Sequence, residues 1–546
     1  MVGGGVRLDK YTAYSQEDLI KEITALKQRK TYGLVWETEK TREQLPEGKL
    51  PVLAEVAEKA VAGDGPTNIL IEGDNYHALT ALQFTHAKAI DVIYIDPPYN
   101  TGNGDFRYND QWVDIEDGYR HSKWLSFMLK RLVIAKNLLV DNGIIFVSID
   151  DNEHARLQLL GDEIFGENNF IGTITWEKRT KAQNTETARH MFQSKTEYIL
   201  IYKKGADKIK FNLEVTGEKE YTLEDRKGLY RLKLVEEMSA VGMRGRQTMI
   251  YPIEKVLPRK GFQWKIGKDQ IEKFRAKGDI ELIEGKVYLK IRPHDETNQT
   301  FLPFWSHFFD KDSYGTSEKG KAELTRILGT PEHEFETVKP VNLIKKLLFH
   351  INKKDCVILD FFAGSGTTGH AVLALNKEDG GNRKFILCTN NENNICTDVC
   401  YPRVKRVMAG YTTPNKEKVA GLGGALRYFR TEFVDAKNTD KNRKEIVKRS
   451  TEIICIKEDA FEKIKSTKEY KLFKNKTYNV GIIFDEDAIE EFITEATKHK
   501  GDIHVYIFSL DESVPDYAFK EIKDRVTLCP IPESLLQAYR QAIKHD

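Results

Sequence analysis

The chain has 546 residues, of which 40% are apolar and 10% aromatic, enough to form a sizeable core and to exclude a disordered protein. Its 84 Lys and Arg residues nearly balance its 83 Asp and Glu residues, so the overall charge indicates no particular partner. Residues 201–300 depart from this balance, with 22 basic and 16 acidic side chains. Such a locally basic segment suits a polyanion bound at one face.

Six cysteines are too few for a disulfide scaffold in a chain of this length. Cys396 and Cys400 lie four apart, but no second pair completes a zinc site, so no metal is predicted. The N-terminus lacks an apolar signal segment, and no run approaches 18 apolar residues. These features predict a soluble intracellular protein without a membrane span.

Residues 1–65 are predicted to form charged helices and loops without assignable chemistry. From residue 66 onward, short apolar strands alternate with helices. The predicted elements are strands at 68–72, 91–95, 144–149 and 197–202, and helices at about 121–140 and 152–165. Strands that are apolar on both faces are typical of parallel sheets covered by helices, so the fold class is α/β.

This alternation stops near residue 205 and resumes with a helix after Pro340, a strand at 356–360 and a strand at 384–388. The charged, irregular sequence between the two parts predicts an inserted domain. Apolar runs at 451–456, 479–484 and 503–508 are predicted as strands of a separate small α/β domain. The predicted segments are 1–65, 66–204, 205–330, 331–429 and 430–546.

The tetrapeptide Asp96-Pro97-Pro98-Tyr99 directly follows the predicted strand 91–95. A carboxylate at the carboxyl end of a parallel strand faces the crevice where α/β sheets bind ligands. Pro97 and Pro98 fix the backbone and remove two N–H donors, so the turn offers carbonyl oxygens without competing donors. A carboxylate, a bare carbonyl and an aromatic ring suit a flat molecule that bears an amino group. The alternative is a proline turn without a chemical role.

A second motif, Asp360-Phe-Phe-Ala-Gly-Ser-Gly-Thr-Thr-Gly369, lies between a predicted strand and a helix that begins near Thr367. Gly364 and Gly366 permit a tight turn and let a ligand approach the backbone closely. The loop lacks the Lys of a Walker A motif, and the chain has no such motif elsewhere. Taken alone, the loop is also consistent with a generic Rossmann-like turn.

Together the two motifs resemble motifs IV and I of the amino-methylating DNA methyltransferases that use S-adenosylmethionine. Their order, with DPPY far ahead of FAGSGTT, is similar to the β class of these enzymes. The strings Asp96–Gly102 and Asp360–His370 most resemble Mod subunits of type III restriction–modification systems. The resemblance covers about residues 66–410. It implies a Rossmann-like methyltransferase with a circularly permuted motif order, in which the insert is the target-recognition domain.

The resemblance also implies roles for individual residues. Asp96 and the Pro97 carbonyl would accept the N–H bonds of a flipped base, and Tyr99 would stack on its face. Glu336-Thr-Val-Lys339-Pro340 resembles motif X, which places Lys339 and Pro340 beside the methionine moiety of the cofactor. The other predicted cofactor residues, from motif I and from a motif III-like Gly73-Asp74, are Asp74, Asp360, Phe362, Gly364, Gly366 and Thr367.

One position departs from the family pattern. The strand after motif I usually ends in an acidic residue that binds the ribose hydroxyls, but this chain has Thr389 there. The sequence therefore leaves the ribose contact open, and Asn390 and Glu392 are the predicted substitutes.

Part of the insert mixes basic and aromatic residues that suit contacts with phosphates or guanine edges. A solvated surface position is the alternative for each single residue. The candidates for DNA binding are Arg244, Arg246, Arg259, Lys260 and Lys265.

We therefore predict an adenine-N6 DNA methyltransferase, the modification and recognition subunit of a type III system. Three alternatives remain open: an N4-cytosine methyltransferase, a DNA-binding specificity subunit with little catalysis, and an RNA methyltransferase. The resemblance implies duplex DNA as substrate, a homodimer, a separate restriction subunit, and a prokaryotic cytoplasm with the protein at the nucleoid.

Overall fold

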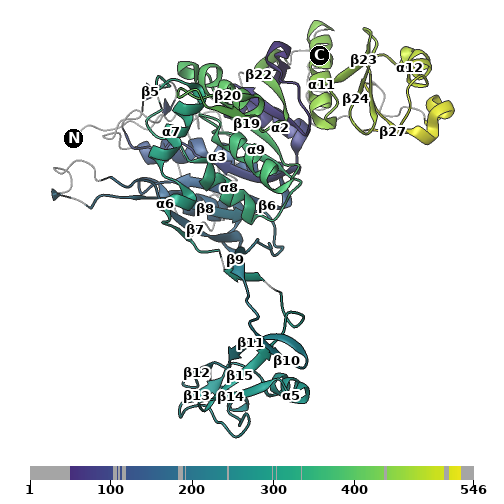
Figure 1. Ribbon diagram of the computed structural model, residues 1–546. Helices are drawn as coiled ribbons and strands as arrows, with labels where there is room; N and C mark the ends of the chain where they lie inside the picture. Colours follow the sequence, from purple (N-terminus) through teal and green to yellow (C-terminus); the bar gives the residue numbers. More distant parts are fainter. Residues whose placement is uncertain are drawn as a thin grey trace, which may run out of the picture. The chain divides into compact units, whose positions relative to one another are not determined.

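The computed structural model describes residues 49–102, 107–108, 111–112, 119–181, 189–190, 192–242, 245–297, 299–302, 304–333, 335–435, 440–508 and 516–529. The chain divides into two compact units, one of residues 1–210 with 306–546 and one of Phe211–Trp305 (Figure 1). Residues 1–48 of the predicted N-terminal helical region 1–65 and the DNA-binding candidate Arg244 lie outside the described residues. The rest of that region differs from the prediction, because the apolar run in Lys49–Glu55 forms a strand of the central sheet.

A ten-stranded sheet forms the centre of the larger unit. Its order is β1 (Lys49–Glu55), β22 (Ala425–Asp435), β2 (Thr67–Glu72), β19 (Lys384–Thr389), β18 (Val357–Asp360), β3 (Ile90–Ile95), β6 (Leu139–Ile149), β8 (Thr196–Lys203), β7 (Phe170–Glu177) and β17 (His307–Phe308). From β22 to β6 all neighbours run parallel. β1 and β8 run antiparallel to their partners. The predicted α/β class is confirmed.

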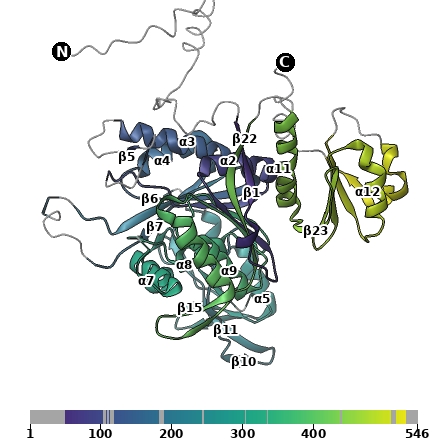
Figure 2. The same cartoon turned by 90° about the horizontal axis from the view of Figure 1, so that it is seen from above.

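Helices cover both faces of this sheet (Figure 2). One face carries α2 (Asn75–His86), α3 (Arg120–Leu138) and α4 (His154–Phe165), and the other carries α8 (Val341–His350) and α9 (Thr367–Asp379). Leu125, Met128 and Leu132 of α3 are buried, as their helical spacing predicts. The strands are apolar on both faces because each face packs against a helical layer.

Shorter elements complete the larger unit. They are the strand pairs β4 (Arg107–Tyr108) with β5 (Gln111–Trp112) and β20 (Gly410–Thr412) with β21 (Lys418–Ala420), and helices α6 (Lys311–Tyr314), α7 (Ser317–Leu328) and α10 (Tyr401–Ala409).

The insert is shorter than the predicted segment 205–330. Residues 306–330 belong to the larger unit, where β17 pairs with β7 and α7 packs its apolar side against the core. Leu324 and Leu328 of α7 contact Val338 and Val399. The charged outer side of α7 makes this helix resemble the insert in composition, but its apolar residues pack within the larger unit.

The smaller unit has its own secondary structure and core. It contains helix α5 (Lys268–Lys277) and a four-stranded sheet. The strand order of this sheet is β10 (Leu223–Asp225), β11 (Gly228–Leu234), β15 (Lys286–Ile291) and β14 (Ile280–Ile283). Two further strand pairs are β12 (Glu237–Ser239) with β13 (Phe262–Trp264), and β9 (Glu214–Glu218) with β16 (Gln299–Leu302). Trp264, Ile271 and Leu289 are buried in its core.

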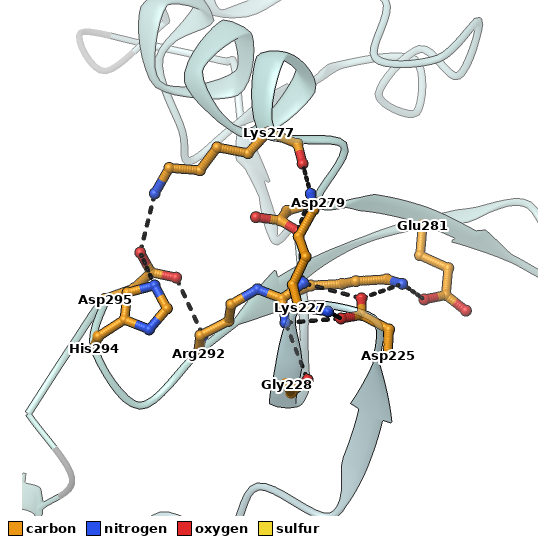
Figure 3. A network of polar contacts seen from close by, with 10 residues as sticks. Asp225, Lys227, Gly228, Lys277, Asp279, Glu281, Arg292, His294 and Asp295 are labelled. Carbon is orange, nitrogen blue, oxygen red and sulfur yellow. Dashed lines mark hydrogen bonds and ion pairs between the residues drawn. The ribbon is translucent and has the colours of Figure 1, made fainter.

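An ion-pair network connects the strands at one end of this smaller sheet (Figure 3). Arg292, only 3% exposed, donates two hydrogen bonds of 2.9 Å to Asp225 and one of 2.9 Å to Asp279. These bonds from Arg292 hold the pKa of Asp225 below its usual range. Asp279 is equally buried, so the guanidinium neutralises a carboxylate that water cannot reach.

The C-terminal part begins with α11 (Asp440–Glu458), because residues 425–435 belong to β22 of the central sheet. The run 451–456, predicted as a strand, is therefore part of a helix. Ile453 and Ile454 contact the C-terminal sheet and Ile456 contacts the central core, so the helix is apolar on several sides and shows little periodicity. The sheet contains β23 (Glu462–Ser466), β24 (Tyr470–Lys474), β25 (Asn479–Ile483), β26 (Ile503–Ile507) and β27 (Val526–Leu528), with α12 (Ile489–Ala496).

The Arg292 network predicts that Arg292→Ala destabilises the smaller unit, because the buried Asp279 would keep only the half-exposed Lys227, at 3.7 Å, as a cation. We expect faster hydrogen–deuterium exchange of the amides of residues 211–305 and a loss of about 5 °C or more in their melting temperature. Arg275→Ala is the control, since Arg275 is 39% exposed in its ion pairs with Glu254 and Glu272 and should change little. Equal effects of the two substitutions would contradict a structural role of Arg292.

Candidate active site

The two predicted motifs meet because β3 and β18 are parallel neighbours. Val92 pairs with Ile358 and Ile93 with Leu359, although the strands are far apart in the sequence. Asp96 follows β3 directly and Asp360 ends β18, so both carboxylates lie at the carboxyl edge of the sheet. β19 and β2 end at the same edge, which brings Asn390 and Asp74 there as well. Ligands of open α/β sheets bind at this edge.

Asp96 is the centre of a compact polar cluster. Tyr99 donates its hydroxyl to Asp96 Oδ1 over 2.7 Å, and Lys339 Nζ lies 2.9 Å from both carboxylate oxygens. Lys339 Nζ also lies 2.8 Å from Tyr99 Oη. Lys339, which the sequence assigned to the cofactor pocket, therefore contacts the DPPY motif in this structure.

Glu197 extends this cluster from β8. Its Oε2 accepts from Lys339 over 3.1 Å, and its Oε1 accepts from Lys178 over 3.0 Å. Burial opposes ionisation of Glu197, but Lys339 and Lys178 more than compensate and lower its pKa. Burial likewise opposes the charge of Lys339, yet Asp96 and Glu197 raise its pKa. The cluster thus contains an ionised carboxylate, Glu197, and an ionised ammonium, Lys339.

Tyr99 remains a neutral hydrogen-bond donor in this cluster. Its burial, followed by the nearby carboxylates of Asp96 and Glu197, raises its pKa well above the ordinary value. Its ring packs against the central core, and Lys339 Nζ lies 5.2 Å from the ring centroid.

Buried hydrogen bonds fix the backbone of the DPPY turn. Pro97 is buried, and the Pro98 carbonyl accepts from the indole of Trp124 over 2.7 Å. Asn100 has a left-handed backbone with φ of 58° and donates its amide to Glu153 over 2.5 Å. Trp124 lies on α3 and Glu153 caps α4, so two helices that cover the sheet hold the turn in place.

The glycine loop places its polar groups around Asp360. The backbone N–H of Phe362 donates to Asp360 Oδ1 over 3.0 Å, and Thr368 donates to Oδ2 over 2.5 Å. Burial raises the pKa of Asp360 to about 7, and Asp96 adds to this effect, although the two donors oppose it. Asp360 is thus a carboxyl group whose ionisation responds to a nearby cation near neutral pH.

The two glycines of the loop differ in their surroundings. Gly364 and Gly366 have φ of 47° and 79°, conformations that disfavour a side chain. A Cβ at Gly366 would lie 3.0 Å from Cys400 Sγ, behind the loop, whereas a Cβ at Gly364 would meet its nearest atom, on Phe335, at 3.6 Å. Gly366 therefore permits close packing of the loop on the protein, which differs from the predicted approach of a ligand.

Side chains that the sequence did not single out hold the loop in place. Arg403, fully buried, donates to Thr367 Oγ1 over 2.7 Å and to Ser365 Oγ over 3.0 Å. The hydroxyl of Thr367 thus contacts Arg403, while its backbone begins α9. Asn75 donates to the Phe361 carbonyl over 2.9 Å. Arg403 and Asn75 lie outside both chemical motifs, so only the tertiary contacts reveal them.

The remaining predicted cofactor residues surround the loop. Asp74 caps α2 by accepting from the Tyr76 backbone over 2.8 Å and is 40% exposed, with the buried Arg131 at 3.5 Å. Asn390 and Glu392 are exposed just after β19. Pro340 is buried at the start of α8. Phe362 packs beside Phe127, with ring centroids 5.9 Å apart.

Thr389 stands where the family has an acidic ribose-binding residue, and Glu72, its partner in the sheet, does not supply that carboxylate. Thr389 is buried and pairs with Glu72 of β2. Glu72 in turn accepts from Tyr428 and from Arg430 over 2.9 Å, so its carboxylate is already engaged. Asn390 and Glu392 stay the predicted ribose residues.

The four predicted DNA-binding residues that the structure describes lie in the smaller unit, on or near β12 and β13. Arg259 pairs with Glu237, at 2.5 Å, and Lys265 pairs with Glu236, so acidic neighbours offset both charges. Arg246 and Lys260 are exposed.

Among the described residues, no group of three or more His, Cys, Asp or Glu side chains is arranged to hold a metal ion. Cys396 and Cys400 are both buried thiols. No described helix has the length and apolar character needed to cross a membrane.

Comparisons with known proteins give consistent results. A family model described as DNA methylase matches residues 90–399. The Mod subunit of the type III restriction–modification enzyme StyLTI from Salmonella typhimurium is 33% identical over 65% of this chain and 59% of its own length. The EcoPI Mod subunit of Escherichia phage P1 is 31% identical over 70% of this chain and 68% of its own length. The type II methyltransferase M.KpnI from Klebsiella pneumoniae is 32% identical over 68% of this chain and 92% of its own length.

The raised pKa of Asp360 predicts a pH-dependent stability. Between its ordinary value of 3.8 and about 7, the folded chain retains a proton that the unfolded chain has lost, so stability falls as the pH rises through this range. Asp360→Asn removes this titration, and we expect a smaller fall in the denaturant midpoint across the same range. The exposed Asp355, at the other end of β18, gives the control Asp355→Asn, which should retain the wild-type slope. Identical slopes for all three proteins would contradict the raised pKa.

Proposed function

The chain belongs to the DNA methylase family that its residues 90–399 match, and we propose that it transfers a methyl group from S-adenosylmethionine to adenine N6 in duplex DNA. We further propose that it is the modification and recognition subunit of a type III restriction–modification system. The resemblance predicted from the two motifs is confirmed, since Mod subunits are among the curated relatives. The chain matches 59% of the first of these relatives, so the partners and substrates of the whole system belong to the proposal.

The observation that carries the proposal is the meeting of Asp96 and Asp360 on adjacent parallel strands. One carboxylate belongs to a turn suited to an amino group and the other to a glycine loop suited to a cofactor. Because the strands are neighbours, a base at Asp96 and a cofactor at the loop would share one crevice. Proximity and alignment of two substrates can lower the activation barrier of a bimolecular transfer, by at most about 7–11 kcal/mol.

The residues at the glycine loop fit S-adenosylmethionine. This cofactor carries a positive sulfonium centre, a ribose with two hydroxyls and an amino-acid group. Asp360, with its pKa of about 7, offers a carboxylate that a cation would keep ionised. Asp74, Asn390 and Glu392 offer polar groups at the same edge. When bound, the cofactor supplies an electrophilic methyl group.

At Asp96 the protein can make a weak nucleophile more reactive. The lone pair of an adenine amino group is delocalised into the ring. Acceptors on both N–H bonds, Asp96 and the Pro97 carbonyl, would localise that lone pair toward the methyl group, and Asp96 would stabilise charge that develops in the transition state. The base must leave the duplex to reach this site, and stacking on Tyr99 would offset part of that cost.

Cytosine N4 is the alternative target, because the same turn could hold its amino group. The experiment that tests the proposal identifies the base directly. Genomic DNA from a methylation-deficient host that expresses the chain is sequenced with a modification-sensitive method. N6-methyladenine at one short sequence supports the proposal, N4-methylcytosine supports the alternative, and unmodified DNA contradicts both.

Within the proposed function, the unit Phe211–Trp305 reads the DNA sequence. Its support is the net positive charge of the segment and the absence of both chemical motifs from it. Of the predicted residues, Arg246 and Lys260 are exposed, whereas Arg259 and Lys265 would have to exchange their acidic partners for phosphates. The cytoplasm of a prokaryote, with the protein at the nucleoid, is the proposed location.

A homodimer and a separate restriction subunit are the proposed partners, on the strength of the likeness to Mod subunits. The C-terminal part, with α11 and its five-stranded sheet, is the proposed interaction domain. Its apolar strand β26 is buried in the domain's own core, so only the outer surface remains for a partner.

Asp96→Ala should reduce methyl transfer by about a hundredfold or more, because the acceptor that is needed in the transition state is lost. Cofactor binding should change little, since Asp96 belongs to the base side of the crevice. Labelled-methyl incorporation and calorimetric titration with S-adenosylmethionine measure the two effects. Asp355→Ala is the matched control. Parallel loss of transfer and cofactor affinity would show that Asp96 lines the cofactor pocket.

Exchange of residues 211–305 for the corresponding unit of a relative should change the methylated sequence and leave the methylated base the same. The reason is that both chemical motifs lie in the other unit. Modification-sensitive sequencing of host DNA measures both outcomes at once. An active chimera with an unchanged recognition sequence would contradict the assignment of this unit.

Truncation after Asp459 should leave methylation intact and abolish dimerisation. The cut keeps α11, whose Ile456 contacts the central core. Ile453 and Ile454, which the cut exposes, are replaced by Ser to keep the product soluble. Light scattering and the methylation assay are the measurements, and a truncated dimer that still methylates would contradict the dimerisation role.

A further inference from the structure

The front of the Asp96 carboxylate is occupied by an ammonium group. Lys339 Nζ lies 2.9 Å from Oδ1 and 2.9 Å from Oδ2, the symmetric position in which one nitrogen bridges both oxygens. The same nitrogen lies 2.8 Å from Tyr99 Oη and 3.1 Å from Glu197 Oε2. A lysine ammonium has three N–H donors, so these four oxygens compete for it.

The proposed function requires an adenine amino nitrogen in the same place. That nitrogen must donate to Asp96, and the bridging position in front of a carboxylate holds one nitrogen at a time. A charged donor binds a carboxylate more strongly than a neutral amino group does. The base can therefore enter only if the ammonium moves to another oxygen that retains its charge partner.

Glu197 provides that partner. Its carboxylate is 8% exposed and touches Lys339 already, so a short movement of Nζ would exchange one carboxylate for another. Its other oxygen is bonded to Lys178, which keeps Glu197 in position during such a movement. Glu197 comes from β8, which carries neither chemical motif, and no sequence pattern points to it.

We infer, on the basis of the proposed function, that Lys339 holds the amino-group position of the base pocket until a base binds and that Glu197 is the positioning residue that receives Lys339 when the target base enters. Without Glu197, displacement of Lys339 would leave a buried ammonium with Tyr99 as its remaining oxygen partner in this cluster. Since a buried charge without its partner is costly, base entry would then be strongly disfavoured.

The test is a double-mutant cycle between Glu197 and Lys339. Single-turnover methyl transfer is measured at saturating cofactor, on a duplex that carries the site mapped by sequencing, for wild type, Glu197→Gln, Lys339→Met and the double variant. Glu177→Gln is the matched control, because Glu177 lies on the neighbouring strand and pairs with Lys195, which is 56% exposed. Calorimetric cofactor binding shows that each variant is folded.

We expect Glu197→Gln to slow transfer by about tenfold or more, and to have little effect when Lys339 is already Met, because no ammonium then needs a new partner. Lys339→Met alone should remain active at alkaline pH. The acid limb of its pH profile should move to higher pH, since the cation that lowers the pKa of Glu197 is gone. The Glu177 control should behave as wild type.

Three results would overturn the inference while the wild type is active. They are an unchanged rate for Glu197→Gln, an equal loss in both Lys339 backgrounds, and inactivity of Lys339→Met at every pH. The second would show that Glu197 is merely structural, and the third that Lys339 takes part in transfer itself. If Glu197→Gln does not fold, Glu197→Asp replaces it, with the carboxylate withdrawn from Lys339 by one methylene. A wild-type chain that transfers no methyl group to DNA would contradict the proposed function as well.

Discussion

The parallel pairing of β3 with β18 is the constraint on which the candidate site depends. It places the DPPY turn and the glycine loop at the same edge of the sheet, although the whole smaller unit lies between them in the sequence. A permuted order of motifs is compatible with one crevice because strand neighbours, rather than sequence neighbours, determine which turns meet. The buried Trp124 of α3 then holds the DPPY turn through the Pro98 carbonyl, and the buried Arg403 of α10 holds the glycine loop through Thr367.

Electrostatics at this edge follow from burial. Asp96, Glu197 and Asp360 are three carboxyl groups close to the base and cofactor positions. Lys339 and Lys178 keep Glu197 ionised, while no cation among the described residues pairs with Asp360, and burial raises its pKa to about 7. The arrangement separates a base side, where lysines face the carboxylates, from Asp360, whose described surroundings offer it no ion pair, and this suits a cofactor that brings its own positive charge.

The division of the chain into two units leaves both chemical motifs in one of them. The central sheet carries both chemical motifs, and the unit Phe211–Trp305 folds around its own core and the Arg292 network. A unit with an independent core can change its surface without altering the crevice, which is compatible with the recognition role proposed for it.

The sequence by itself determined the α/β class, the two motifs and their family, because apolar strands and short chemical motifs depend on local residue patterns. It also located Asp96 and Asp360 at strand ends. The sequence did not predict the boundary of the insert, because the charged helix α7 resembles the insert in composition. It also did not predict the helix at 451–456, because a helix that is buried on several sides lacks a clear apolar periodicity. Only the tertiary structure placed Lys339 on Asp96 and added Glu197, Lys178 and Arg403, because these contacts join strands and loops distant in the chain and leave no short-range pattern.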